Sequence, residues 1–141
     1  MARRTAAPLD LRIPSDIRHI EDAVAQVLVA LAPLPLPRQH LALNIPVALT
    51  EALSNAILRG NGDDPGKTVL IRVRPQPDRV VIEVADEGLG FDLDACTGDA
   101  TAPDALERED GRGLFLMRRL MDGVERFTDG GNVVRLTLRI A

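Results

Sequence analysis

The sequence predicts a single α+β domain, a two-layer α/β sandwich with a mixed sheet and its helices on one face. Three observations lead to this. The chain has 141 residues, which suits one domain with its own core. Alternating segments typical of strands stand at 9–14, 68–75, 79–86 and 124–140, with helical patterns between them. These elements are grouped rather than strictly alternating, which favours a sandwich over a doubly wound parallel sheet.

Composition excludes several classes of protein. The net charge is -4 and no Lys/Arg cluster has base-stacking aromatics beside it, which argues against direct nucleic-acid or anionic-membrane binding. The lone Cys96 cannot form an intramolecular disulfide, and "MARRTAAPLD" lacks the apolar core of a secretion signal. The apolar run "AVAQVLVALAPLPLP" falls short of the roughly 18 residues of a membrane span. We therefore expect a cytoplasmic protein.

The first third of the chain predicts a strand followed by a helix. "LDLRIP" alternates like a short strand, and Ser15 is a candidate N-cap for the helix after it. The prolines of "APLPLPRQ" end this helix, because they cannot continue its hydrogen-bond ladder. The apolar residues expected to form its buried stripe are Ile17, Ile20, Val24, Val27, Leu28 and Leu31.

A second predicted helix carries the stretch "EALSNAILRGN". Either this helix starts near Asn44 with Pro46 in its first turn, or a longer helix kinks at the proline. Glu51 and Asn55 stand four residues apart and therefore point to the same side of the helix. They form one polar spot within an otherwise apolar run.

The second half of the chain predicts two hairpins separated by a long loop and a helix. The first hairpin joins "TVLIRVRP" to "RVVIEVAD", and the last one turns at "DGGN". Residues 91–112 are polar, acidic and without apolar periodicity, which predicts a long mobile loop. "GLFLMRRLMDG" restores a helical pattern that Gly123 should close. The residues expected on the buried face of the first hairpin include Val69, Ile71, Val73 and Val81.

Two glycine clusters flank the predicted loop. "DEGLGFD" comes directly off a strand, and Gly88 and Gly90 permit close ligand approach beside the free acceptor of Asp86. "GRGLFL" places two glycines and Arg112 where the loop meets a helix, a junction suited to phosphate. Its spacing departs from the P-loop and dinucleotide fingerprints, so both of those folds are disfavoured.

Taken together, in this order, the polar pair and the two glycine clusters resemble the N, G1 and G2 boxes of the GHKL ATPase superfamily, the group of gyrase, Hsp90, histidine kinases and MutL. The resemblance covers nearly the whole chain. The compact size, the words "EALSNAI" and "GNGDDPGK", and the ending "GNVVRL" look most like the anti-sigma-factor serine kinases of bacterial partner-switching systems.

The resemblance implies a role for each motif residue. Asn55 matches the Mg²⁺-coordinating asparagine, Glu51 the catalytic glutamate, and Asp86 the acceptor of the adenine amino group. The segment 92–112 matches the ATP lid. The full set implied to bind nucleotide is Asn55, Arg59, Asp86, Gly88, Gly90, Phe91, Gly111, Arg112, Gly113, Leu114 and Asn132.

Two positions depart from the family pattern. Arg59 stands where these kinases commonly carry His, and it either contacts a phosphate or caps the helix C-terminus. Asn132 stands where many members have a Thr that helps hold adenine through water, which affects the expected adenine geometry. His19 and His40 lack the spacing of metal ligands and are expected at the surface.

The resemblance implies a Mg-ATP-dependent serine/threonine kinase that phosphorylates a small antagonist protein and sequesters a sigma factor, acting as a homodimer. The alternative is a non-enzymatic nucleotide-dependent binding module, or a detached histidine-kinase-type catalytic domain. Retention of Glu51 favours the enzyme, because a catalytic base has no use without a hydroxyl to activate.

Overall fold

The structure is a computed structural model that describes residues 6–88 and 113–140. Gly90, Phe91, Gly111, Arg112 and the predicted lid 92–112 therefore lie outside the described residues. The fold and the rest of the expected site fall inside them.

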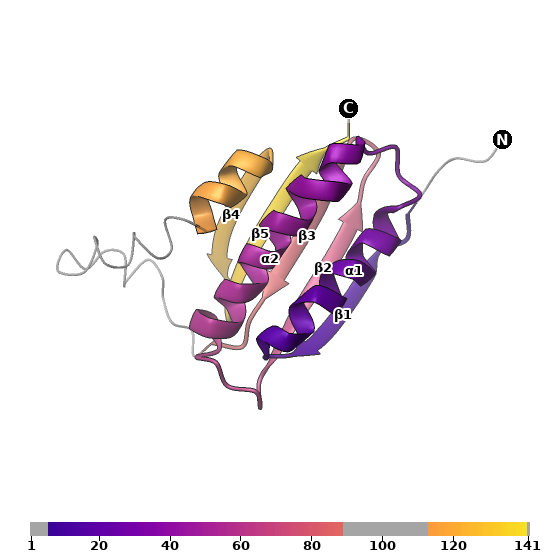
Figure 1. The fold of residues 1–141 in the computed structure, drawn as a ribbon. Helices are drawn as coiled ribbons and strands as arrows, with labels where there is room; N and C mark the ends of the chain where they lie inside the picture. The colour runs from indigo at the N-terminus through magenta and orange to yellow at the C-terminus, as the bar shows by residue number, and fades with distance from the viewer. Residues whose placement is uncertain (1–5, 89–112, 141) are drawn as a thin grey trace.

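A five-stranded sheet forms one layer, and the helices cover one of its faces (Figure 1). The strand order is β1-β2-β3-β5-β4, and all four pairings among the described strands are antiparallel, where a mixed sheet was expected. The two-layer α+β prediction is confirmed. The strands are β1 (Leu9–Pro14), β2 (Thr68–Pro75), β3 (Arg79–Ala85), β4 (Gly123–Thr128) and β5 (Asn132–Arg139).

Alternation along β2 and β3 turns one set of aliphatic side chains toward the helices. Val69, Ile71 and Val73 are fully buried, as predicted. Val81 is only half-buried and lies on the other face, because it pairs with Arg74 while Val73 pairs with Ile82. The prediction for Val81 was wrong by one residue of register, which moves a side chain to the opposite face.

The first helical segment begins at Asp16 rather than Ser15. Asp16 caps η1 (Ile17–His19) by accepting a hydrogen bond from the Arg18 backbone N–H, and α1 (Ile20–Leu31) follows. Ser15 is buried instead, and its side chain contacts Asn61. Ile17 is 53% exposed and is not part of the buried stripe, whereas Val24, Val27 and Leu31 are buried as predicted.

The Asp16 cap should titrate at unusually low pH. The Arg18 guanidinium donates to both carboxylate oxygens, which lowers the pKa of Asp16 from 3.8 to about 2. The carboxylate therefore stabilises the fold above pH 3.8, and this contribution is lost as the pH falls toward 2. Arg18→Ala should move the midpoint back toward 3.8, measured by NMR titration of the carboxyl carbon. An Asp16 midpoint near 3.8 in the unaltered protein would contradict the ion pair.

One continuous helical segment contains η2 (His40–Asn44), α2 (Ile45–Asn55) and η3 (Ala56–Gly60). The structure thus has the longer of the two helices that the sequence allowed. Pro46 has no N–H to donate, and a π turn precedes it, with the Ile45 N–H bonded to the His40 carbonyl five residues back. A second π turn, η3, follows Asn55 at the other end.

The segment His40–Gly60 is the one helix among the described residues that is long and apolar enough to cross a membrane. One such helix is a weak indication of a membrane span, because core helices have the same length and composition. Here the inner face is part of the core. Its fully buried residues are Ile45, Ala48, Leu49, Ala52, Leu53 and Ile57.

The predicted helix after the loop is present over 113–120 and lies on the same side of the sheet as α1 and α2 (Figure 1). Met117 anchors it in the core at 1% exposure. Gly123 does not close the helix as expected, since it is the first residue of β4. The final hairpin, β4 and β5, is confirmed.

Candidate functional site

The polar pair on α2 faces the start of the helix at 113–120. Glu51 and Asn55 are half-buried near the C-terminal end of α2. A methyl group added at Gly113 would lie 3.1 Å from Glu51 Oε2 and 3.3 Å from Asn55 Nδ2. The structure therefore brings together three predicted site residues from two segments far apart in the sequence. Glycine at 113 keeps the space between backbone and side chains open.

Asp86 leaves β3 at the same end of the molecule, close to the start of β5 (Figure 1). Its Oδ1 atom accepts hydrogen bonds from the Gly88 N–H at 2.8 Å and from the Asn132 N–H at 3.0 Å. The Asp86 N–H donates to the Asn132 carbonyl at 3.0 Å. These bonds fix the carboxylate and leave Oδ2 without a hydrogen bond from the described residues. Oδ2 remains available as an acceptor for a ligand.

Three glycines pack around Asp86. A methyl group at Gly60 would lie 1.7 Å from Asp86 Oδ2, and one at Gly131 would lie 2.1 Å from the Asp86 carbonyl oxygen. A methyl group at Gly88 would lie 2.4 Å from the Gly60 carbonyl oxygen. No side chain larger than hydrogen fits at these positions without displacing backbone or Asp86. The glycines thus allow η3, the turn after β3 and the final hairpin to meet at one carboxylate.

Asn132 holds an orphaned polar atom beside this carboxylate. The residue is 6% exposed, its Nδ2 lies 3.4 Å from Asp86 Oδ1, and its buried Oδ1 has no hydrogen-bond partner among the described residues. A buried acceptor without a donor is costly, and a bound ligand or its water can supply one. The residues on this side of the site therefore fit a ligand that offers N–H donors.

The remaining described site residues lie near these two groups. Arg59 lies in the last turn of η3, where a cation is favoured by the helix dipole. Leu114 is half-buried and packs against the core. Among residues 6–88 and 113–140, no group of three His, Cys, Asp or Glu side chains is arranged to hold a metal. Mg²⁺ bound with a nucleotide needs few protein oxygens, and the Asn55 amide oxygen fits that need.

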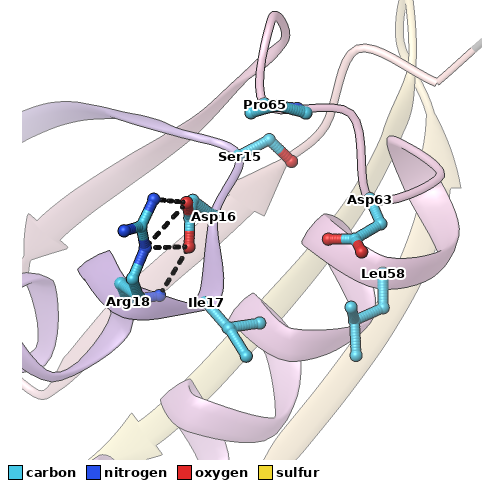
Figure 2. A pocket seen from close by; sticks show the side chains of 7 residues that line it. All are labelled: Ser15, Asp16, Ile17, Arg18, Leu58, Asp63 and Pro65. Atoms are coloured by element: carbon cyan, nitrogen blue, oxygen red, sulfur yellow. Dashed lines mark hydrogen bonds and ion pairs between the residues drawn. The ribbon is translucent and has the colours of Figure 1, made fainter.

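A pocket of about 420 Å³ lies apart from these groups, where η1 meets the end of η3. Figure 2 shows the paired Asp16 and Arg18 at the left, Leu58 and Asp63 at the right, and Ile17 between them. None of the residues predicted for nucleotide binding lines this pocket. Ser15 lines it and also contacts Asn61, which lies behind the Asp86 turn.

Sequence reasoning missed Gly60, Asn61 and Gly131. Gly60 and Gly131 have no ligand chemistry of their own, and their importance arises only where Asp86 packs on them. Asn61 follows the motif helix directly and looks like a turn residue in "RGNGDD". The available signal was the position of Gly60 and Asn61 at the end of the helical segment that carries Glu51 and Asn55.

The chain matches a known protein family and several named proteins. Residues 13–138 match the family of histidine kinase-like ATPase domains. The chain is 35% identical over 99 residues to the serine-protein kinase RsbW of Halalkalibacterium halodurans, which covers 67% of this chain and 60% of the relative. It is 34% identical to the RsbW of Bacillus subtilis, covering 62% of that protein. It is 30% identical to the anti-sigma F factor of Clostridium perfringens, over 68% of this chain and 69% of the relative.

The chain spans about three fifths of the length of the RsbW proteins it matches. The family match extends from the end of β1 to the end of β5. It includes both the polar pair on α2 and the Asp86 group. The chain belongs to the family of histidine kinase-like ATPase domains.

Proposed function

We propose that this chain is a Mg-ATP-dependent serine/threonine protein kinase and anti-sigma factor. It phosphorylates a small antagonist protein and sequesters a sigma factor when that antagonist is unavailable. The observation that carries the proposal is the placement of Glu51 and Asn55 against Gly113. Similarity to proteins named serine-protein kinase RsbW and anti-sigma F factor supports the choice of substrate and partner. The homodimer and the cytoplasmic location belong to the same proposal.

Asn55 and Glu51 would act at the phosphate end of the nucleotide. When bound, Mg-ATP supplies the phosphoryl group for transfer. The Asn55 amide oxygen is the hard ligand that magnesium prefers. Glu51, one helical turn earlier, would orient the attacking hydroxyl and accept its proton. Gly113 and the segment before it would offer backbone N–H groups at a helix start, and this includes Gly111 and Arg112 outside the described residues.

Asp86 and Asn132 would hold the base. Asp86 Oδ2 would accept a hydrogen bond from the adenine amino group, and Asn132 Oδ1 would accept one from the base or from its water. Guanine presents a carbonyl at the position of that amino group, so a carboxylate selects adenine. The Gly88 N–H holds Asp86 Oδ1 in place, and Gly90, Phe91 and the lid 92–112 remain predictions outside the described residues.

Arg59 keeps two possible roles. As the cation in the last turn of η3 it stabilises the helix end, and its charge also suits a phosphate. Both roles are compatible with the absence of the histidine common in these kinases.

The kinase proposal is tested by incubating the purified protein with Mg²⁺, labelled ATP and candidate antagonist proteins. Transfer to an antagonist serine or threonine, with release of the sigma factor by unphosphorylated antagonist, is the expected result. ATP binding without transfer to any antagonist would favour the alternative function, a nucleotide-dependent binding module. Transfer to a histidine of a partner would indicate a detached sensor-kinase domain instead.

Asp86→Asn should weaken ATP binding by about 10- to 100-fold, because the amide can present a donor where the adenine amino group needs an acceptor. Calorimetry on the folded variant measures this. Glu83→Gln is a matched control, since that carboxylate lies on the open face of the sheet and pairs with Arg135. Unchanged ATP affinity in Asp86→Asn would rule out the proposed base pocket.

A further inference from the structure

Asn61 connects three segments behind the proposed base pocket. The residue follows η3 directly and is 2% exposed. Its Oδ1 accepts a hydrogen bond from the Glu87 N–H at 2.8 Å. Its Nδ2 donates to Ser15 Oγ at 3.1 Å and to the Thr68 carbonyl at 2.9 Å. Both N–H groups of the Asn61 amide are therefore in use, and so is one of the two lone pairs on its oxygen.

The exposed Glu87 side chain adds a second link between the turn after β3 and the start of β2. Its carboxylate accepts hydrogen bonds from the Thr68 hydroxyl at 2.6 Å and from the Thr68 N–H at 2.5 Å. The Thr68 hydroxyl bond, and then the backbone bond, lower the pKa of Glu87 below its ordinary value. The turn after β3 is thus held by its backbone at Asn61 and by a side chain at Thr68.

These contacts determine where Asp86 points. The peptide between Asp86 and Glu87 carries the N–H that Asn61 accepts, while Asp86 Oδ1 is bound by Gly88 and Asn132. With both ends held, the carboxylate has one orientation, in which Oδ2 lies against Gly60. Without Asn61, the 86–87 peptide could rotate toward other partners and carry the carboxylate with it.

We propose that Asn61 is a positioning residue for adenine recognition, which holds the Glu87 amide so that Asp86 presents Oδ2 to the base. This inference rests on the proposed adenine role of Asp86. No other side chain of similar size replaces Asn61 fully. An aspartate at 61 would place a second acceptor against the Thr68 carbonyl, and a leucine would leave Glu87, Thr68 and Ser15 unpaired.

The test compares two ligands, Mg-ATP and the triphosphate of purine riboside, which lacks only the amino group that Asp86 would bind. The unaltered protein should prefer ATP. Asn61→Ala should lower ATP affinity by about tenfold or more, and affinity for purine riboside triphosphate by about twofold or less. The preference should thus collapse, with the phosphate contacts intact. A general loss of structure would weaken both ligands alike.

Ser15→Ala is the matched control. It removes one partner of Asn61 and leaves the bonds to Glu87 and Thr68 in place. Both variants should melt at lower temperature than the unaltered protein, but Ser15→Ala should keep the preference for ATP. An equal loss of preference in both would show that stability, and not Asn61, sets the geometry.

Amide hydrogen exchange supplies a readout that needs no variant. In the unaltered protein without nucleotide, the Glu87 amide should exchange at least about tenfold more slowly than an unprotected amide. Free exchange at Glu87, or a folded Asn61→Ala that keeps the ATP preference, would overturn the inference. Equal affinity of the unaltered protein for both ligands would instead overturn the adenine role of Asp86, and with it the proposed function of this side of the site.

Discussion

Glu51→Gln is expected to reduce phosphate transfer by about 10²- to 10⁴-fold while ATP affinity stays within about threefold. Glutamine keeps the size of the side chain and one acceptor oxygen, but it cannot take the proton of the attacking hydroxyl. Glu51 is half-buried beside Gly113, and the near-equal size of glutamine should keep the packing there. The measurement pairs calorimetry of Mg-ATP with transfer to the antagonist.

Asn55→Ala on the same helix face gives the contrast. It removes the proposed metal ligand, so ATP affinity should become weak and nearly insensitive to Mg²⁺, while Glu51→Gln keeps its Mg²⁺ dependence. If Glu51→Gln transfers phosphate at the unaltered rate, no proton is accepted at that position and the catalytic role of Glu51 fails. Absence of transfer by the unaltered protein would instead favour a binding module.

Gly60→Ala is expected to weaken adenine nucleotide binding by about 100-fold or more, although position 60 carries no functional group. The new methyl group would lie 1.7 Å from Asp86 Oδ2 and 2.3 Å from its Cγ, so the carboxylate must move. Displacing it removes the acceptor for adenine and disturbs the turn at Gly88, whose backbone packs on the Gly60 carbonyl. Calorimetry with ATP measures the loss.

Two variants separate the effect on the site from an effect on folding. Gly66→Ala lies in the turn that follows η3, and its methyl group would meet only the exposed Asp64 carboxylate, so ATP affinity should change by about twofold or less. Gly60→Ala combined with Asp86→Ala removes the clashing carboxylate and leaves only the Cβ of residue 86, 2.9 Å from the new methyl group. It should therefore recover part of the thermal stability lost in Gly60→Ala alone, without recovering binding. A double variant as unstable as the single one would contradict the packing described here.

The fold was largely predictable because its elements have clean periodicities. Leu9–Pro14 alternates strictly and Thr68–Pro75 alternates apart from Leu70, and the prolines after Leu31 end α1. The hairpins follow from short polar turns between alternating segments. Local sequence patterns do not show which strands are neighbours in the sheet. They therefore could not predict that every pairing among the described strands is antiparallel.

The errors concern side chains whose environment depends on one residue of register or on a competing partner. Val81 is as apolar as Ile82, and only the pairing with β2 decides which of them faces the helices. Ser15 and Asp16 are both good caps, and the choice was decided by Asn61, which takes the Ser15 hydroxyl into the interior.

In the candidate site, side chains with functional groups could be singled out from the sequence, and residues that only provide space or support could not. Glu51, Asn55 and Asp86 stand out as polar groups in apolar or glycine-rich stretches. Gly60, Gly131 and Asn61 matter because three distant segments converge on Asp86. Such convergence is a property of the tertiary structure, and no local spacing in the sequence records it.

The π turn η3 connects Asn55, on the phosphate side of the proposed site, to Gly60, on the base side. One residue more or fewer in this turn would rotate everything after it by about 100° around the helix axis. Insertions and deletions between these two positions should therefore be far more damaging than substitutions, and Leu58, which is 45% exposed, should accept most side chains. In a randomised library of this segment, selection for ATP binding should retain its length and leave the residue at 58 variable.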